Sequence, residues 1–298
     1  MCATCGCSDG ATHSIADPAA GSAPTGAHLH VHDHGGGHVH THDHDDHGHE
    51  HHHHRDDHGR PEHHDAGDLD HGEEERAART VRLEHEILAK NNLVAERNRG
   101  WCEGRAVLAL NLMSAPGAGK TTLLERTIGA LGGEVPIAVI EGDQATQRDA
   151  ERIRAAGCRV VQITTGTGCH LDAAMIAQAL RALAPPPGAL VMIENVGNLV
   201  CPALFDLGEH AKVVIASVTE GEDKPLKYPH MFRAAQLMVL NKIDLLPHLA
   251  FDAEQCLAYA RRVNPRLHIV EVSATRGDGL DAWYAWLRDE LRATSAPR

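Results

Sequence analysis

The chain has 298 residues, including 25 His and 8 Cys, and a formal net charge of −13. The charge is uneven, because residues 1–80 carry 16 acidic and 4 basic side chains whereas residues 81–298 carry 25 and 24. A near-neutral body argues against a nucleic-acid-binding surface, and no run of 18 or more apolar residues is present to span a membrane.

Three cysteines stand at the N-terminus, in the sequence MCATCGC. No apolar leader precedes them, so we expect reduced thiols and a cytoplasmic location. Three thiolates, or thiolates together with the α-amine, suit a soft divalent ion; a square-planar set favours Ni²⁺ and a tetrahedral set favours Zn²⁺. Residues 1–12 are therefore predicted to form a metal site with Cys2, Cys5 and Cys7 as ligands.

Residues 13–72 are rich in His, Asp, Gly and Pro, with 18 His between His28 and His71. Such a segment buries too little apolar surface to offset the entropy of ordering, which predicts disorder. Neutral imidazoles bind Ni²⁺, Zn²⁺ and Cu²⁺, so the tract is expected to hold several ions. A role in solubility or pH buffering is the alternative.

Residues 73–104 are predicted to form a leading helix and a connector. Apolar residues recur at roughly helical spacing, and neither Pro nor Gly occurs between Glu74 and Arg99. The apolar positions are Val81, Ile87, Leu88 and Val94.

Residues 105–298 alternate short apolar runs with helical stretches, which predicts one α/β domain with a doubly wound, mostly parallel sheet. The expected strands are Val107–Met113, Ile137–Glu141, Arg159–Ile163, Leu190–Glu194, Val213–Val218, Leu237–Asn241 and His268–Val272. The expected helices lie near 119–131, 146–156, 171–183, 252–263 and 279–292.

The sequence SAPGAGKTT follows the first strand of this domain and matches a phosphate-binding loop, except that Ser114 replaces the first glycine. Glycines let backbone N–H groups approach phosphate oxygens, and the following helix turns its positive end toward the anion. Lys120 is expected to reach the β- and γ-phosphates, and Thr121 to bind Mg²⁺. The predicted nucleotide contacts are Gly117, Ala118, Gly119, Lys120, Thr121 and Thr122.

Acidic residues end two further strands. Asp143 ends the second strand, and Glu194 opens the sequence ENVG, which fits a D-x-x-G switch motif with Glu for Asp. Gly197 could then donate its N–H to the γ-phosphate. Asp143 and Glu194 are candidates for holding Mg²⁺ or the attacking water, which gives a predicted catalytic set of Lys120, Asp143, Glu194 and Gly197; the alternative is that the two acids cap strand–helix junctions.

A cysteine–histidine pair follows the third strand, and a further cysteine follows the switch motif. Because the carboxyl ends of parallel strands share one edge of a sheet, Cys169, His170 and Cys201 could converge on one metal ion. Three ligands leave a four-coordinate site open, which a two-fold dimer could close. A buried structural role for the cysteines is the alternative.

The sequence Asn241-Lys242-Ile243-Asp244 ends an apolar strand and matches the N-K-x-D motif of GTPases. Asp244 can accept two hydrogen bonds from guanine, which adenine does not offer, so ATP is disfavoured. Ser273 and Ala274 follow the next strand and fit the loop that contacts the guanine O6. Together with the phosphate-binding loop, these residues predict a GTPase.

The chain resembles the nickel-inserting GTPases of hydrogenase and urease maturation. The likeness is carried by CATCGC, the His tract, SAPGAGKTTL, VIEGDQAT, TGTGCHLDA, IENVGNLVCPA, SVTEGEDKPLKYPHMF and NKIDLLP. The urease branch has Cys-Pro-His at its metal motif, whereas this chain has Gly-Cys-His and a separate Cys201, which favours the hydrogenase branch.

The resemblance implies a GTP-dependent homodimer, a tight nickel site at the N-terminal cysteines, and a weaker nickel or zinc site in the GTPase domain. It also implies action with the small zinc protein HypA to load nickel into the large-subunit precursor of [NiFe]-hydrogenase. Two alternatives remain open: nickel storage or detoxification by the tail, and a GTPase chaperone for another metalloenzyme such as urease.

Overall fold

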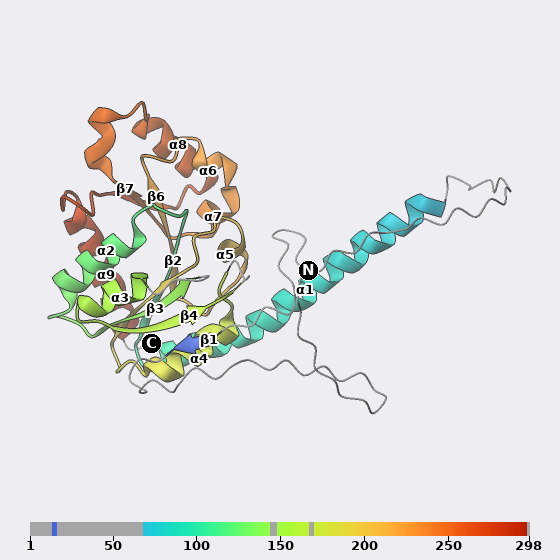
Figure 1. Ribbon diagram of the computed structural model, residues 1–298, viewed down its shortest axis with the longest axis horizontal. Helices are drawn as coiled ribbons and strands as arrows, with labels where there is room; N and C mark the ends of the chain where they lie inside the picture. Colours follow the sequence, from blue (N-terminus) through green and yellow to red (C-terminus); the bar gives the residue numbers. More distant parts are fainter. Residues whose placement is uncertain (1–13, 17–67, 144–147, 167–169, 297–298) are drawn as a thin grey trace, which may run out of the picture.

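The computed structural model describes residues 14–16, 68–143, 148–166 and 170–296. Its centre is one eight-stranded sheet with the order β1-β4-β3-β5-β2-β6-β7-β8 (Figure 1). All neighbouring strands are parallel except β1, which pairs antiparallel with β4. The strands are β1 Ser14–Ala16, β2 Leu108–Ser114, β3 Ile137–Asp143, β4 Arg159–Thr164, β5 Leu190–Glu194, β6 Ala211–Ser217, β7 Leu237–Asn241 and β8 His268–Glu271.

The prediction of a doubly wound, mostly parallel sheet is confirmed. The seven strands expected in residues 105–298 are β2–β8, each within two residues of its predicted ends. The helices are α1 Asp68–Glu103, α2 Lys120–Leu131, α3 Arg148–Ala155, α4 Ala173–Leu183, α5 Cys201–Leu204, α6 Lys224–Lys227, α7 Pro229–Ala234, α8 Ala253–Val263 and α9 Leu280–Ser295, with a 3₁₀ helix, η1, at Ile243–His248.

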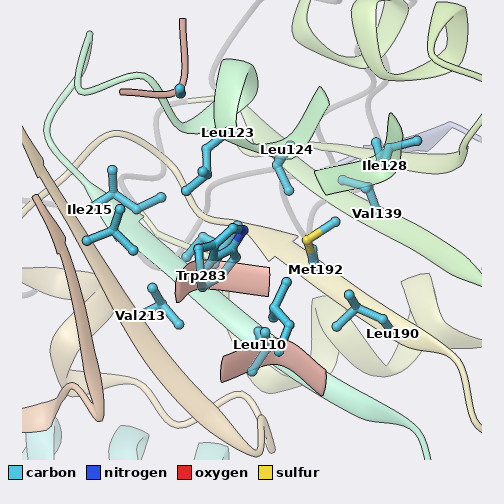
Figure 2. Packing of buried hydrophobic residues seen from close by; sticks show 14 of the residues in the cluster. Leu110, Leu123, Leu124, Ile128, Val139, Leu190, Met192, Val213, Ile215 and Trp283 are labelled. Carbon is cyan, nitrogen blue, oxygen red and sulfur yellow. The ribbon is translucent and has the colours of Figure 1, made fainter. Parts of the chain in front are cut away.

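Two apolar layers cover the sheet. On one face, α2, α3 and α9 pack on alternate residues of the central strands, and Figure 2 shows Trp283 of α9 lying over Leu110 of β2. The indole Nε1 of Trp283 donates to Thr127 Oγ1 at 2.9 Å, so the ring's polar atom is satisfied inside this layer. On the other face, α1 and α4 pack over β3, β4 and β5, and α7 and α8 pack over β6 and β7.

The structure differs from the sequence prediction at the N-terminal side. Residues 14–16, which lie in the segment predicted to be disordered, form an edge strand in which Ile15 stands opposite Ile163 of β4. Helix α1 begins at Asp68 and continues through Gly100 to Glu103, beyond both predicted ends. The rest of residues 13–67 lies outside the described residues. Packing of the C-terminal part of α1 on the domain offsets the cost of about 1 kcal/mol for a helical glycine.

Four short helical segments were absent from the prediction: α5, α6, α7 and η1. Each spans four to six residues, and each contains a proline, at Pro202, Pro225, Pro229 and Pro247 respectively. Such segments are too short to show a 3.6-residue apolar period, and proline is tolerated only in a first helical turn or a break.

Figure 1 shows α1 as a long rod that projects from the sheet domain. Its exposed apolar side chains include Val81, Leu83 and Leu93, whereas its C-terminal part contains the buried Asn91, Ala95 and Asn98. Among the described residues, no helix is both long and apolar enough to cross a membrane.

Candidate nucleotide and metal site

A pocket of about 430 Å³ opens at the carboxyl edge of the central strands. This volume lies in the range of small-ligand sites. Its walls come from the loop between β2 and α2, from the end of β3, from α3 and from the segment after β5. The lining residues are Pro116, Gly117, Gly119–Thr122, Glu141–Asp143, Asp149, Arg152 and Glu194–Asn198.

The loop between β2 and α2 has the backbone that the glycine pattern predicts. Gly117 and Gly119 take φ values of +77° and +95°, in the left-handed region that favours glycine. A Cβ on Gly119 would lie 2.4 Å from Asn241 Nδ2, so no larger residue fits there. Helix α2 begins at Lys120 with no side-chain cap, so its first N–H groups remain available to an anion in the pocket.

Ser114, the departure from the phosphate-loop consensus, has a specific contact. Its hydroxyl is buried at the end of β2 and accepts a hydrogen bond from Lys120 Nζ at 2.9 Å. The same hydroxyl donates to the Ala115 carbonyl at 2.6 Å. Ser114 therefore holds the ammonium of Lys120 at the pocket, a role that the consensus motif does not reveal.

Two buried carboxylates stand side by side in the pocket wall, since Glu141 of β3 and Glu194 of β5 are in register. They are 2% and 4% exposed, and Thr121 Oγ1 donates to Glu194 Oε1 at 3.0 Å. Within the described residues, Oε2 of each has no hydrogen-bond partner. Glu141 is a candidate residue that the sequence prediction missed; its position two residues before Asp143, on the same strand face, is the signal that could have identified it.

The electrostatics of this carboxylate pair fit a divalent cation. Burial, and then the charge of Glu194, raise the pKa of Glu141 to about 8. Burial likewise raises the pKa of Glu194 to about 7, against the opposing effects of Lys120 and of the Thr121 hydrogen bond. Two buried carboxylates with orphaned oxygens are costly unless a cation or a proton compensates them. Hard oxygen ligands of this type are those that Mg²⁺ prefers.

The remaining predicted catalytic residues also line the pocket. Asp143 ends β3, and its backbone carbonyl accepts from the Thr165 N–H at 2.9 Å. Gly197 approaches the phosphate-binding loop closely, because a Cβ there would lie 3.0 Å from Pro116 Cγ. The structure thus brings Lys120, Asp143, Glu194 and Gly197 into one pocket.

Arg152 of α3 is a second residue that the sequence analysis missed. Its guanidinium lines the pocket and is held by Glu125 Oε1 and Oε2 at 3.0 and 2.7 Å. It also donates to Thr122 Oγ1 at 3.4 Å. An arginine beside a phosphate-binding loop can stabilise phosphate charge, but the sequence has no motif that singles this arginine out.

The predicted base-binding residues lie beside the phosphate pocket, outside its lining. Asn241 Nδ2 donates to the Ala118 carbonyl at 2.9 Å, and its Oδ1 accepts from the Ala274 N–H at 3.0 Å. Lys242, at φ +65°, donates from Nζ to the Gly117 carbonyl at 2.6 Å. Asn241 therefore ties the phosphate-binding loop to the loop after β8.

The two other predicted base contacts stand on the segments that follow β7 and β8. Asp244 lies half-buried on η1, and Ser273 is buried beside Ala274. The five predicted base-binding residues thus lie on the segments after β7 and β8, which the hydrogen bond between Asn241 and Ala274 joins.

The second predicted metal site, called here the body metal site, has Cys169, His170 and Cys201 as its ligands, and the structure describes it only in part. Cys169 lies outside the described residues. His170 stacks on Phe205, with ring centroids 4.0 Å apart, and Phe205 directly follows the helix that Cys201 begins. Burial lowers the pKa of His170, which favours the neutral imidazole that binds metals. Among the described residues, no three His, Cys, Asp or Glu side chains form a metal-binding group.

The N-terminal metal ligands also fall outside the described residues. These are Cys2, Cys5 and Cys7, together with the His tract from His28 to residue 67. The other cysteines, Cys102, Cys158, Cys201 and Cys256, are buried. Burial raises the pKa of Cys102, Cys158 and Cys256 to about 11, which keeps these three thiols protonated and unreactive.

Comparisons with known proteins place this geometry among relatives. Residues 108–271 match the family described as CobW/HypB/UreG, nucleotide-binding domain. The chain is 60% identical over 210 residues to a hydrogenase maturation factor HypB of Azotobacter vinelandii, covering 70% of this chain and 69% of that protein.

Two solved structures are similar over most of their own length. A hydrogenase maturation factor HypB from Archaeoglobus fulgidus superimposes with a TM-score of 0.65 at 44% identity, covering 68% of this chain and 100% of that one. HypB from Helicobacter pylori, solved in complex with nickel, gives a TM-score of 0.65 at 36% identity, covering 70% and 98%.

Proposed function

Because the chain belongs to the CobW/HypB/UreG family, and within it to the HypB hydrogenase maturation factors, we propose that it is a GTP-hydrolysing nickel metallochaperone. Its client is the large-subunit precursor of [NiFe]-hydrogenase, and it acts in the cytoplasm. The observation that carries the proposal is the single pocket that gathers Lys120, Thr121, Glu194 and Gly197 beside the Asn241 base-binding loops.

In this proposal, each residue has a distinct task toward GTP. The first N–H groups of α2 and the Lys120 ammonium neutralise the β- and γ-phosphates. Gly197, already close to Pro116, donates its N–H to the γ-phosphate, and Asp143 orients the attacking water. Asp244 pairs with the guanine edge, while Asn241 keeps the base and phosphate loops in fixed relation.

The residues present fit a magnesium ion. Thr121, Glu194 and Glu141 would hold it, since their oxygens converge in the pocket wall and both carboxylates have an orphaned Oε2 in the described part of the chain. When bound, the ion supplies positive charge that offsets the negative charge developing on the phosphates.

Nickel is the cargo of the proposed function. The Helicobacter pylori relative was solved in complex with nickel, which supports a nickel site in this chain. We assign the body site to Cys169, His170 and Cys201, which follow strands at the nucleotide edge of the sheet. Zinc is the competing ion at this site.

The switch in this proposal is the segment around Asp143 and Glu194–Gly197. GTP orders the segment and draws two copies together across the body metal site. Hydrolysis relaxes it, changes the metal geometry and releases nickel toward a HypA-like zinc protein and the hydrogenase precursor. The N-terminal cysteines supply a second nickel site, and the His tract stores further ions.

Nickel storage is the second candidate function, favoured by the 19 His that precede residue 72. Replacing the His residues between 17 and 67 by serine removes most of the His tract and changes no residue of β1 or α1. Retained hydrogenase maturation with lower nickel capacity supports delivery as the main function. Loss of nickel tolerance with unaffected maturation supports storage.

Phosphate release from GTP and from ATP tests the proposed enzyme activity. The full chain should hydrolyse GTP and leave ATP intact, and Asp244→Asn should abolish the preference for GTP. Equal hydrolysis of both nucleotides by the unsubstituted chain would contradict the assignment.

A further inference from the structure

Asn195 lies inside the segment Glu194–Gly197 of the proposed switch. It is the first residue after β5, is 1% exposed, and separates Glu194 from Val196. Its Oδ1 accepts two backbone N–H groups, from Val196 at 3.0 Å and from Leu171 at 3.4 Å. One carboxamide oxygen thus joins the start of the γ-phosphate segment to the residue that follows His170.

Leu171 contacts both strand ends that carry the pocket carboxylates. Besides its bond to Asn195 after β5, its fully buried side chain packs on Gly142 of β3, where a Cβ would lie 2.9 Å from the leucine. Gly142 lies between Glu141 and Asp143. A displacement of either strand end therefore reaches Leu171 directly, and with it the adjacent His170.

A chain of buried polar side chains binds the Nδ2 atom of Asn195. Asn195 Nδ2 donates to Asn111 Oδ1 at 3.1 Å, and Asn111 Nδ2 donates to Glu209 Oε1 at 3.2 Å. The Glu209 carboxylate is also bound by Lys212 Nζ and, at 2.7 Å, by the Leu207 N–H. Since these groups are buried and satisfied, they give the carboxamide a fixed orientation.

We propose that Asn195 is a positioning residue that couples nucleotide state to nickel affinity, through its shared hydrogen bonds to Val196 and Leu171. When the γ-phosphate draws in Val196–Gly197, the Asn195 carboxamide is displaced with this segment while its oxygen stays directed at Leu171, and this shifts Leu171 and the His170 ligand. This role rests on the proposed function, because it needs a nickel site at His170 and Cys201. If Asn195 had a purely structural role, substituting it would lower stability and leave the coupling intact.

Thermodynamic linkage allows the coupling to be measured through nucleotide affinity. If the nucleotide changes nickel affinity by a given factor, nickel changes nucleotide affinity by the same factor. The full chain is titrated with fluorescent GDP and with a fluorescent non-hydrolysable GTP analogue, in Mg²⁺, with and without saturating Ni²⁺. For each nucleotide, the affinity with Ni²⁺ is divided by the affinity without it. The coupling factor is this ratio for the analogue divided by the same ratio for GDP. Cys201→Ala removes the contribution of the body site.

Three further variants isolate Asn195. Asn195→Ala removes its hydrogen bonds, and Asn195→Ser keeps a polar group too short to reach Leu171, in case the alanine variant folds poorly. Asn264→Ala is the matched control. Asn264 also joins separate segments, donating from Nδ2 to the Phe232 and Ala235 carbonyls at 3.1 and 2.9 Å, far from the pocket in the fold.

The unsubstituted chain and Asn264→Ala should give a coupling factor of about fivefold or more. Cys201→Ala and both Asn195 variants should give a factor within about twofold of unity. A full coupling factor in either folded Asn195 variant overturns the role of Asn195 but leaves the proposed switch standing. A factor of unity in the unsubstituted chain overturns the nickel switch itself, and the role of Asn195 with it.

Discussion

The phosphate pocket and the body metal site lie at the same edge of the sheet but are built differently. The phosphate pocket is shaped mainly by backbone conformation. Its main features are two left-handed glycines, an uncapped helix start and a close approach of Gly197 to Pro116. At the metal site, side chains from two separate segments must meet: His170 stacks on Phe205, which directly follows the short helix that Cys201 begins.

This difference predicts how each region responds to change. A site made by backbone geometry is preformed and intolerant of any added atom, so substitutions there act on binding directly. A site made by side chains on two loops depends on how those loops are held, so it can respond to the nucleotide next to it. Substitutions at Gly119, Cys201, Glu141 and Ser114 test that contrast.

Gly119→Ala should weaken GTP binding by about 100-fold or more, because alanine at φ +95° is strained and its Cβ would meet Asn241 Nδ2 at 2.4 Å. The measurement is titration with the fluorescent non-hydrolysable GTP analogue. Gly129→Ala, on the same helix with open space at its Cβ, is the control and should bind normally. Normal binding by Gly119→Ala would show that the loop is not preformed.

Cys201→Ala should weaken nickel binding at the body site by about tenfold or more, while GTP hydrolysis changes by less than about threefold. Metal titration of full chains that also carry serine at Cys2, Cys5 and Cys7 isolates this site from the N-terminal cysteines. Cys256→Ala, another buried thiol, is the control and should leave nickel binding unchanged. A nickel affinity unaffected by Cys201→Ala would remove the metal side of the contrast.

Glu141→Gln should flatten the pH dependence of stability in the nucleotide-free protein. Because folding raises the pKa of Glu141 to about 8, its contribution to stability is fully present below about pH 4.5 and is lost as the pH rises through 8. The free energy of unfolding should fall by on the order of 2 kcal/mol more between pH 5 and 8 in the unsubstituted chain than in Glu141→Gln.

Glu134 supplies the control for this titration. It is an exposed residue whose pKa is lowered by a hydrogen bond from Arg288, so Glu134→Gln should leave the slope between pH 5 and 8 unchanged. Urea unfolding at the two pH values measures all three proteins. Identical slopes for the unsubstituted chain and Glu141→Gln would mean that Glu141 is not held protonated by its buried position.

Ser114→Ala should weaken affinity for the GTP analogue by only about threefold. It removes the hydroxyl that holds Lys120 Nζ but leaves the loop backbone unchanged. Ser295→Ala, whose hydroxyl bonds only within the exposed end of α9, is the matched control. A loss as large as that of Gly119→Ala would show that Lys120 placement outweighs backbone geometry.

The fold and the phosphate pocket could largely be predicted from sequence, because each rests on local patterns. Apolar strand runs predicted β2–β8, and the spacing of Gly117, Gly119 and Lys120 predicted the loop at the end of β2. The roles of Glu141, Arg152 and Asn195 could not be predicted in this way. Those of Glu141 and Asn195 depend on strand register and on contacts across β2, β3 and β5, and that of Arg152 depends on its contact with Glu125 of α2; no single stretch of sequence records these relations.

The decisive measurement is nickel release from the loaded full chain to a colorimetric chelator. Release is followed after GTP or its non-hydrolysable analogue is added. The part of the release that Cys201→Ala abolishes reports the body site. This part of the release should be faster with GTP than with the analogue, because hydrolysis relaxes the switch. Equal rates with GTP, with the analogue and without nucleotide would contradict the claim that the GTPase controls nickel delivery.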